Sequence, residues 1–354
     1  EKFIAYDLSR RQQGHGRGGR MKIEKDHAEI YTGVRHGNSL GSPIGLILPN
    51  KDFENWTTKM SSKSVEAEIK KVTLPRPGHA DLAGVQKYDS DDIRNILERS
   101  SARETTMRVA LASICRILLR EVGIAVGSRV VQIHNVKDET LLSENITPEA
   151  LNKKADKSPV RCLDKKVEKR MIDAIDKAKQ EGDSVGGVFE VIASGLPYGL
   201  GSHTKWDAKL HARIAESIMS VNAFKGIEIG MGFESAKHLG SAVHDEIGWD
   251  GKKYTRYSNN AGGIEGGMSN AQPIVIRAVM KPIPTLIKPL RSVDIETKEE
   301  KLAHKERTDT CAVPSASVVA ESMLCFVLAD AMLEKFGGDT MDQLKAHIKV
   351  SGNY

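Results

Sequence analysis

Apolar residues recur at the spacing of a helix in several stretches of the chain, and this periodicity predicts helices there. The stretches are residues 1–12, 91–121, 167–179, 207–223 and 315–336. In the last stretch, Val319, Met323, Val327 and Ala331 recur every four residues, so we expect them to form one buried face. The stretches at 91–121 and 315–336 have the strongest helical pattern, and we expect their apolar faces to pack on the core.

Shorter apolar runs that end near Gly or Pro predict strands. The strands are expected within residues 21–34, 40–48, 123–136, 186–193 and 274–279, with a pair of strands in 123–136. The run at 40–48 is apolar enough to predict a buried strand. Residues 137–183 are polar and charge-mixed, and we expect a peripheral excursion there, which contains the helix at 167–179. Strands and helices alternate irregularly, which predicts a mixed α/β protein.

Size and composition exclude several classes of protein. The chain has 354 residues, 40% of them hydrophobic, which is enough for one large or two ordinary domains. The net charge of +5 is too small to indicate nucleic acid, and 5% aromatic residues offer few stacking platforms. The four cysteines are far apart, which argues against zinc and disulfides and fits a reducing compartment. With no run of about 18 apolar residues and no signal peptide, we expect a cytoplasmic protein without a membrane span.

One stretch, residues 258–285, has the most unusual sequence in the chain. Six consecutive residues contain four glycines, namely Gly262, Gly263, Gly266 and Gly267. Such a loop lets backbone N–H groups form a concavity for an anion, and Lys281 adds a cation after the predicted strand. The alternative is a flexible surface turn. The strand-like flank and the prolines beside Lys281, which stiffen the backbone, favour the anion-binding interpretation.

Arginines gather in four further segments, which are the loop at 14–20, the turn at 76–81, the predicted helix start at 99–106 and the stretch at 307–314. A guanidinium group offers a planar fork of donors that suits phosphate and carboxylate. A helix that begins at Ser100 or Ser101 would add free N–H groups and partial positive charge beside Arg99 and Arg103.

Each arginine segment also has a simpler interpretation. The loop can be a solvated basic loop, the helix start an ordinary capped helix, and Arg307 with Asp309 an exposed ion pair. His79 can be a surface residue, although histidines in general can donate or accept a proton near neutral pH, and this one lies in a Pro-Gly turn beside Arg76 and Asp81. The residues alone indicate a mixed α/β protein with an arginine-rich pocket for a polyanionic ligand.

Taken together, these segments resemble the chorismate synthase family. The matching blocks run in family order from about residue 9 to 340, and they are GRGGRMKIEKD, LGSPIG, RPGHAD, RSSARET, GLGS, NAFKGIEIGMGF, SNNAGGIEGG, KPIPT and RTD. One block would be weak evidence, but this many in register is specific. The resemblance implies an α/β (α+β) fold, a β-α-β sandwich with helices between antiparallel sheets, formed by a single domain over residues 1–354.

The resemblance also implies an activity. The family are lyases that convert 5-enolpyruvylshikimate 3-phosphate to chorismate and phosphate by a 1,4-anti elimination, the last common step of the shikimate pathway of aromatic amino acid biosynthesis. They require reduced FMN, although the reaction has no net redox change, and they are commonly homotetramers. No flavin-reductase segment is visible in the chain, so we expect reduced FMN from a flavin reductase or another external source.

By match to the family's motifs, particular residues acquire expected roles. His79 would give a proton to the flavin, and Asp309 would help the flavin N5 accept the substrate proton. The FMN contacts implied are Arg99, Ser100, Ser101, Asn222, Ala223, Gly266, Lys281, Pro282, Ile283, Pro284, Thr285 and Arg307. The substrate contacts implied are Arg17, Arg20, Arg76, Arg103 and Arg307, while Arg11 and Arg17 match positions linked to NADP. No metal site is implied.

The sequence departs from the family at its start. The family's Gly-Glu-Ser-His-Gly block, whose histidine is thought to protonate the leaving phosphate, has no counterpart in the chain. We therefore expect that an N-terminal segment of a few tens of residues is missing from the sequence, and that a polypeptide truly without it is inactive or severely impaired.

Two other functions use the same features. A flavin oxidoreductase could bind NADPH in the basic pocket, and it would consume NADPH in each turnover. A nucleic-acid-binding protein could use the basic loop at 14–20, although few aromatics and the even spread of Asp and Glu disfavour it.

Overall fold

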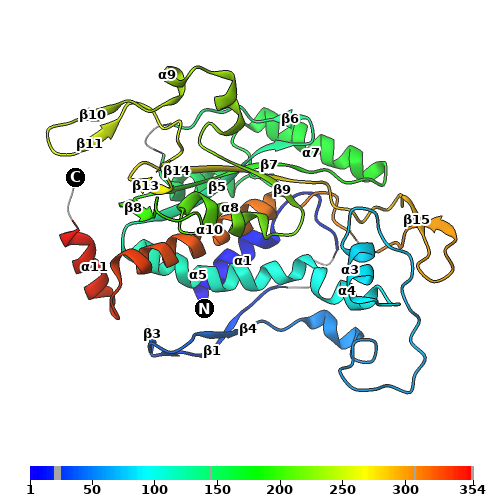
Figure 1. Cartoon of the computed structure of the whole chain (residues 1–354). Helices are drawn as coiled ribbons and strands as arrows, with labels where there is room; N and C mark the ends of the chain where they lie inside the picture. Colours follow the sequence, from blue (N-terminus) through cyan, green and yellow to red (C-terminus); the bar gives the residue numbers. More distant parts are fainter. Residues whose placement is uncertain (20–24, 144–145, 307, 352–354) are drawn as a thin grey trace.

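A five-stranded antiparallel sheet forms the upper layer of the molecule (Figure 1). The computed structural model describes residues 1–19, 25–143, 146–306 and 308–351. The strands of the sheet, in spatial order, are β6 (Val136–Lys137), β5 (Ala125–Ile133), β7 (Gly187–Ser194), β14 (Ile274–Met280) and β9 (Phe224–Ile229). Along β14, buried and half-buried residues alternate, so one face of the strand carries Ile274, Ile276, Ala278 and Met280 into the core.

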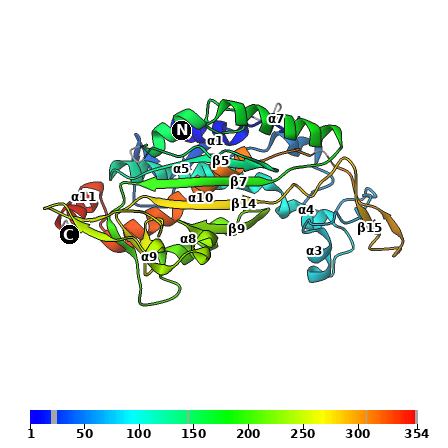
Figure 2. The same ribbon diagram turned by 90° about the horizontal axis from the view of Figure 1, so that it is seen from above.

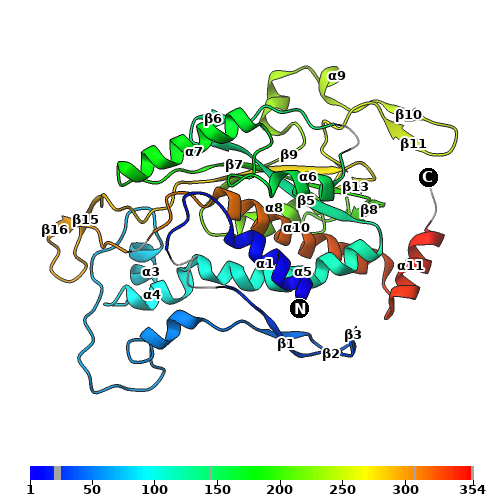
Figure 3. The same ribbon diagram turned by 180° about the vertical axis from the view of Figure 1, so that it is seen from behind.

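Helices cover the sheet and form the centre of the core. Helix α10 (Val313–Phe336) packs across β5 and β7, and α1 (Lys2–Gln12), α5 (Thr105–Glu121) and α8 (Leu210–Met219) pack against α10. Figures 1 and 3 place α1, α5 and α10 between this sheet and a ribbon of β1 (Glu29–Thr32) and β4 (Gly45–Ile47). The predicted α+β class, with helices between antiparallel sheets, is confirmed.

The remaining elements are short or lie around this centre. Seen from above, α7 runs along the β5 side of the sheet (Figure 2). Two helices pack on that side, α6 (Pro148–Ala155) on β5 and α7 (Lys165–Gln180) on β5 and β6. The other helices are η1 (Lys51–Asn55), α3 (Asp81–Tyr88), α4 (Arg94–Ser100), η2 (Ala102–Glu104), η3 (Gly232–Lys237), α9 (Gly240–Val243) and α11 (Met341–Val350). The other strands are β2 (Val34–Arg35), β3 (Asn38–Ser39), β8 (Tyr198–Gly201), β10 (Ile247–Trp249), β11 (Tyr254–Arg256), β12 (Ile264–Glu265), β13 (Met268–Asn270), β15 (Arg291–Val293) and β16 (Glu300–Leu302).

Helix α10 is buried on all sides. Besides the predicted face, Val318, Leu324, Cys325 and Leu328 are also buried, because the sheet and three helices surround α10. Its length and composition would allow it to cross a membrane, but 78% of its most apolar window is buried inside the protein. The predicted face is confirmed at Val319, Val327 and Ala331, Met323 is half-buried, and burial extends beyond that face.

Two further predictions are corrected by the structure. The expected excursion at 137–183 contributes to the main core, because Leu151, Met171 and Ile175 are fully buried along the narrow apolar stripes of α6 and α7. The expected buried strand at 40–48 is only the short β4, and Ile47 is 43% exposed. A two-stranded ribbon has too few neighbours to bury both of its faces.

The predicted helix at 91–121 is divided into α4, η2 and α5. The Ser101 hydroxyl accepts a hydrogen bond from the Arg103 N–H and so caps η2, whereas the N-cap position of α5 is Glu104. The helices in 1–12 and 207–223 and the strands in 186–193 and 274–279 are confirmed. In 123–136 the structure has one long strand, β5, with the short β6 beginning at its end, and part of the strand expected at 21–34 lies outside the described residues.

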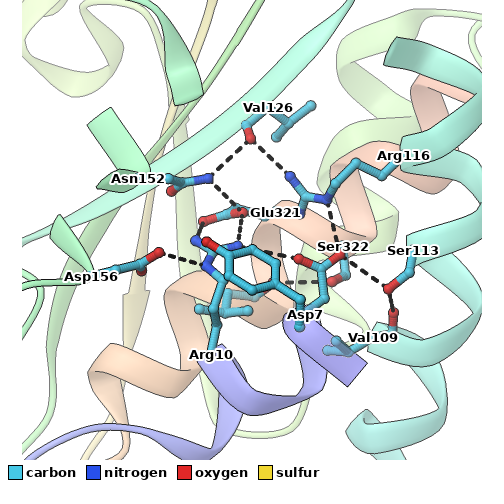
Figure 4. Close-up of polar contacts among 12 residues, drawn as sticks. Asp7, Arg10, Val109, Ser113, Arg116, Val126, Asn152, Asp156, Glu321 and Ser322 are labelled. Carbon is cyan, nitrogen blue, oxygen red and sulfur yellow. Dashed lines mark hydrogen bonds and ion pairs between the residues drawn. The ribbon is translucent and has the colours of Figure 1, made fainter. Parts of the chain in front are cut away.

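A network of buried charges joins α1 to the core helices (Figure 4). The fully buried carboxylate of Glu321, on α10, accepts hydrogen bonds from Arg10 at 2.8 and 2.9 Å and from Arg116 at 2.9 Å. Asp7 and Asp156 add two more carboxylates, at 3.5 Å and 2.9 Å from Arg10. Because the charges are paired, the network holds α1 at a fixed angle. Arg11, which follows Arg10 on α1, is therefore held in place as well.

Candidate active site

The turn before α3 holds His79 in a charged cluster. Asp81, the first residue of α3, accepts from Arg76 Nε at 2.9 Å and contacts His79 Nδ1. Burial opposes the charge on Asp81, but hydrogen bonds from His79 and Arg76 hold the pKa of this carboxyl well below its usual range. The ionised carboxylate therefore orients the imidazole through Nδ1, while Arg76 Nη2 lies 3.4 Å from Nε2. The His79 side chain is 18% exposed, so a ligand can reach it.

The segment Lys281–Thr285 closes over this turn. Arg76 Nη1 donates to Thr285 Oγ1 at 2.9 Å, and Lys281 Nζ donates to the Gly78 carbonyl. A Cβ on Gly78 would lie 3.4 Å from Lys281 Nζ and 3.6 Å from Pro284, which shows how closely the two segments approach. Burial, and then the neighbouring Lys225, lower the pKa of Lys281. An anion at this point would relieve the unfavourable environment of that ammonium group.

Further contacts extend the site to α4. The Lys281 N–H donates to the Ala223 carbonyl at 3.0 Å, and Asn222 Nδ2 donates to the Ser100 carbonyl at 3.2 Å. Four segments that are far apart in sequence therefore contact one another in a row, in the order 76–81, 281–285, 222–223 and 99–101. These are the segments in which most of the expected flavin positions lie.

A second cluster forms around Arg11. Arg11 Nε donates to Thr105 Oγ1 at 3.1 Å, and its Nη1 lies 3.5 Å from Asp26, which also pairs with Arg103. Burial lowers the pKa of Arg11 to about 10, and the positive charges of Arg17 and Arg103 act in the same direction. Among the described residues, Arg11 Nη1 is buried without a hydrogen-bond partner.

Asp309 belongs to the same cluster. Its Oδ1 accepts the Gly18 N–H at 2.6 Å, and its Oδ2 lies 3.1 Å from Arg17 Nη1. A Cβ on Gly18 would lie 2.9 Å from the Thr308 carbonyl, so this close approach requires glycine. With Arg11 and Arg103, the described part of this cluster brings three guanidinium groups together around the carboxylates of Asp26 and Asp309.

The two clusters are neighbours. Glu306 lies 3.9 Å from Arg76, in the His79 cluster, and Asp309 lies in the Arg11 cluster. Glu306 and Asp309 are three positions apart in the sequence, so their Cα atoms are within about 11 Å. A pocket of about 180 Å³ lies beside Arg103. Its lining residues are Leu48, Asn50, Glu98, Arg99, Ser101, Arg103, Glu104, Thr106 and Met107.

Not every expected site residue joins this group. Arg20 and Arg307 lie outside the described residues. Gly266 lies in the β12–β13 turn next to Gly267, whose carbonyl accepts the N–H of Leu210 at the start of α8. Asn222 follows the other end of α8, and a ten-residue helix is about 15 Å long. Within one chain, the structure therefore does not bring Gly266 next to the other expected flavin positions.

The glycine-rich stretch also differs from its interpretation as an open anion loop. A Cβ on Gly262 would lie 2.3 Å from the Gly230 nitrogen, and one on Gly263 would lie 2.6 Å from the Pro273 carbonyl. These two glycines allow backbone segments to pack closely against each other. The anion-binding interpretation was wrong for them, because protein backbone already fills the space that a ligand would need.

The sequence did not indicate several residues of the site. Asp26, Glu104, Thr106 and Glu306 are isolated polar residues without a characteristic spacing. Asp26 ends the block GRGGRMKIEKD and Glu104 lies within RSSARET, so the blocks themselves were the only signal for these two. Their partners come from distant segments, and only the folded chain identifies them.

Comparisons with known proteins agree with this architecture. The family model described as chorismate synthase matches residues 1–333. Chorismate synthase 2 of Bacillus cereus is 55% identical over 99% of this chain and 91% of that protein. Chorismate synthase of Bacillus licheniformis is 53% identical over 98% of this chain and 90% of that protein. A crystal structure of chorismate synthase has 42% identity and a TM-score of 0.78, over 99% of this chain and 88% of that one.

By fold and family, the protein is an enzyme of the lyase class. More particularly, the chain belongs to the chorismate synthase family, which places it in the shikimate pathway.

Proposed function

We propose that the enzyme eliminates phosphate from 5-enolpyruvylshikimate 3-phosphate in the 1,4-anti sense. The substrate loses one proton and one phosphate, the electrons of the C–H bond form the new double bond, and chorismate has no net change in oxidation state. The substrate carries two carboxylates and a phosphate, about four negative charges at neutral pH, which need paired cations when buried. The observation that carries the proposal is the gathering of the guanidinium groups of Arg11, Arg17 and Arg103 next to the His79 cluster.

Within this proposal, Arg17, Arg76 and Arg103 would bind the anionic groups of the substrate. Arg20 and Arg307, which lie outside the described residues, are proposed for the same role from the resemblance alone. The proposed contact of NADP with Arg11 and Arg17 draws on the same gathering of guanidinium groups. Arg11 Nη1 lies 3.5 Å from Asp26 but has no hydrogen-bond acceptor among the described residues, and this supports an anionic ligand because a buried donor without a hydrogen bond is costly.

The residues present fit a flavin. Arg99, Ser100, Ser101, Asn222, Ala223 and the segment Lys281–Thr285 would hold reduced FMN, with Lys281 near its phosphate. When bound, reduced FMN supplies an electron-rich ring that assists loss of phosphate and uptake of the proton. Burial of neighbouring groups such as Arg76 would strengthen each charge interaction.

His79 and Asp309 would handle protons. His79 is oriented through Nδ1 by Asp81, so its Nε2 can give a proton to the flavin. Asp309 is oriented by the Gly18 N–H and by Arg17, and it would help move the substrate proton towards the flavin N5. We also propose a cytoplasmic homotetramer that receives reduced FMN from a flavin reductase or another external source.

Anaerobic turnover tests this function. The enzyme is mixed with 5-enolpyruvylshikimate 3-phosphate and dithionite-reduced FMN, and phosphate and chorismate are measured together. We expect one phosphate for each chorismate, and no turnover with oxidised FMN. Absence of phosphate release would overturn the proposal, and one NADPH oxidised for each turnover in a parallel assay would favour an oxidoreductase.

A further inference from the structure

Two buried oxygen atoms beside the pocket have no partner within the described part of the chain. They are Oγ1 of Thr106, a residue that is 1% exposed, and Oε1 of Glu104. Both residues line the pocket of about 180 Å³. Buried polar atoms are almost always hydrogen-bonded, so an unpartnered pair at the wall of a pocket points to a group supplied by a ligand.

Neither atom is needed for the local fold. Glu104 occupies the N-cap position of α5 but makes no side-chain capping bond, and its other oxygen, Oε2, accepts from Arg108 Nε at 2.8 Å. The hydroxyl of the preceding Thr105 already donates to the Ala102 carbonyl, which is the ordinary role of a threonine at this place. The ion pair with Arg108 holds the carboxylate in place and leaves Oε1 as an acceptor.

The lining of the pocket limits the chemistry of its ligand. Glu104 Oε1 needs an N–H or O–H donor. Arg99 and Arg103, which also line the pocket, allow the rest of the ligand to carry negative charge. Leu48 and Met107 provide apolar walls, which suit a flat ring better than a hydrated polyol chain. Whole-ligand sites usually measure roughly 300–1,000 Å³, so this smaller pocket takes one end of a larger molecule.

We propose that the pocket recognises the imide edge of the flavin ring. The flavin N3–H would donate to Glu104 Oε1, and the Thr106 hydroxyl would donate to the adjacent ring carbonyl. The inference rests on the proposed use of FMN. It fits the contacts of the site, because Ser100 and Asn222 connect the pocket to Lys281, where the flavin phosphate is proposed to bind.

Binding of FMN and of N3-methyl-FMN, which lacks the imide donor, tests the proposal without turnover. Dissociation constants for both are measured by calorimetry on the full chain. We expect wild type to bind N3-methyl-FMN about tenfold more weakly than FMN, since one hydrogen bond to a carboxylate is lost. In Glu104→Gln, FMN binding should weaken and the tenfold ratio should fall to about threefold or less.

Matched variants separate this role from a general effect on the pocket. Glu98→Gln removes an exposed acid from the same pocket and should leave the ratio at about tenfold. Thr106→Val should weaken FMN binding about fivefold, and Thr106→Ser should restore it, with thermal unfolding of each variant as the control for folding.

The outcomes are distinct. Equal binding of the two flavins by wild type, or equal effects of Glu98→Gln and Glu104→Gln, would overturn the inference while the proposed function stands. Failure of wild type to bind FMN in either redox state would overturn the use of flavin and this inference together. Phosphate release in the anaerobic assay then reports separately on the elimination.

Discussion

Two consecutive residues of α1, Arg10 and Arg11, lie in opposite electrostatic surroundings. Arg10 is buried, which by itself lowers its pKa, but Glu321 and Asp7 raise that pKa above the ordinary value. Arg11 is equally buried, and its pKa is lowered to about 10, first by that burial and then by the charges of Arg17 and Arg103, which Asp26 offsets only in part. Around Arg10, arginines and carboxylates are equal in number and closely paired. The cluster around Arg10 holds the fold together, whereas the cluster around Arg11 is the one that we propose to bind an anionic ligand.

The largest effect on stability is expected from removing a carboxylate of the paired cluster around Arg10. Glu321→Gln leaves Arg10, Arg116 and Arg161 around a neutral group, so the free energy of unfolding should fall by about 3–5 kcal/mol. Urea unfolding measures this change. On the same helix, Asp330→Asn removes an exposed ion pair with Arg213 and should cost less than about 1 kcal/mol. Equal losses of unfolding free energy in both variants would contradict the distinction between buried, paired charges and exposed ion pairs.

A substitution at Asp309 tests the cluster around Arg11. Asp309→Ala should reduce turnover with reduced FMN by about 10²–10⁴-fold, because a positioned proton-transfer group is lost. The dissociation constant for FMN should change by less than about threefold. Asp176→Ala, which removes an exposed carboxylate paired with His15 near the same loop, is the control and should keep most of the turnover. If FMN binding vanished and the residual rate followed the bound flavin, Asp309 would have a binding role instead.

The contrast between Arg10 and Arg11 could not be predicted from the sequence. Adjacent arginines in a helix look alike, and their partners, Glu321 and Asp26, come from distant segments without any local pattern. The turn at 76–81 and the segment 281–285 were predictable, because a rigid Pro-Gly turn and a proline-flanked lysine mark them locally. Their contact with each other was expected only through the family resemblance.

The fold, like the site, could be predicted from the sequence only in part. Strands and helices with a strong period, such as β14 and α8, were predicted close to their observed bounds. Helices α6 and α7 were misplaced at the periphery because charged residues outnumber their few core residues, of which Met171 and Ile175 are fully buried. The composition of a segment gives its average polarity, whereas the burial of a helix depends on one narrow stripe of apolar residues along it.

The pH dependence of stability tests another paired carboxylate, Asp81 of the His79 cluster. Its folded pKa lies below the unfolded value, so its contribution to stability is complete above about pH 5 and decreases as the pH falls through the acid range. Asp81→Asn should therefore lower the free energy of unfolding by about 2 kcal/mol at pH 7, and the difference from wild type should shrink below about pH 4. Urea unfolding at several pH values measures it. A difference that stayed constant down to pH 3 would exclude charge as the cause.

The smallest effect on stability is expected at Arg11. Arg11→Met removes a cation that lies near Arg17 and Arg103, and Asp26 beside it keeps its ion pair with Arg103, so the free energy of unfolding should change by less than about 1 kcal/mol. Arg10→Met should cost about 3 kcal/mol or more. The affinity for the polyanionic substrate should nevertheless fall about tenfold, since one charge-assisted hydrogen bond is lost. Calorimetric titration without flavin measures that affinity. If Arg11→Met lost stability as Arg10→Met does and kept its affinity, the two arginines would have the same structural role, and the guanidinium groups around Arg11 would no longer indicate a ligand.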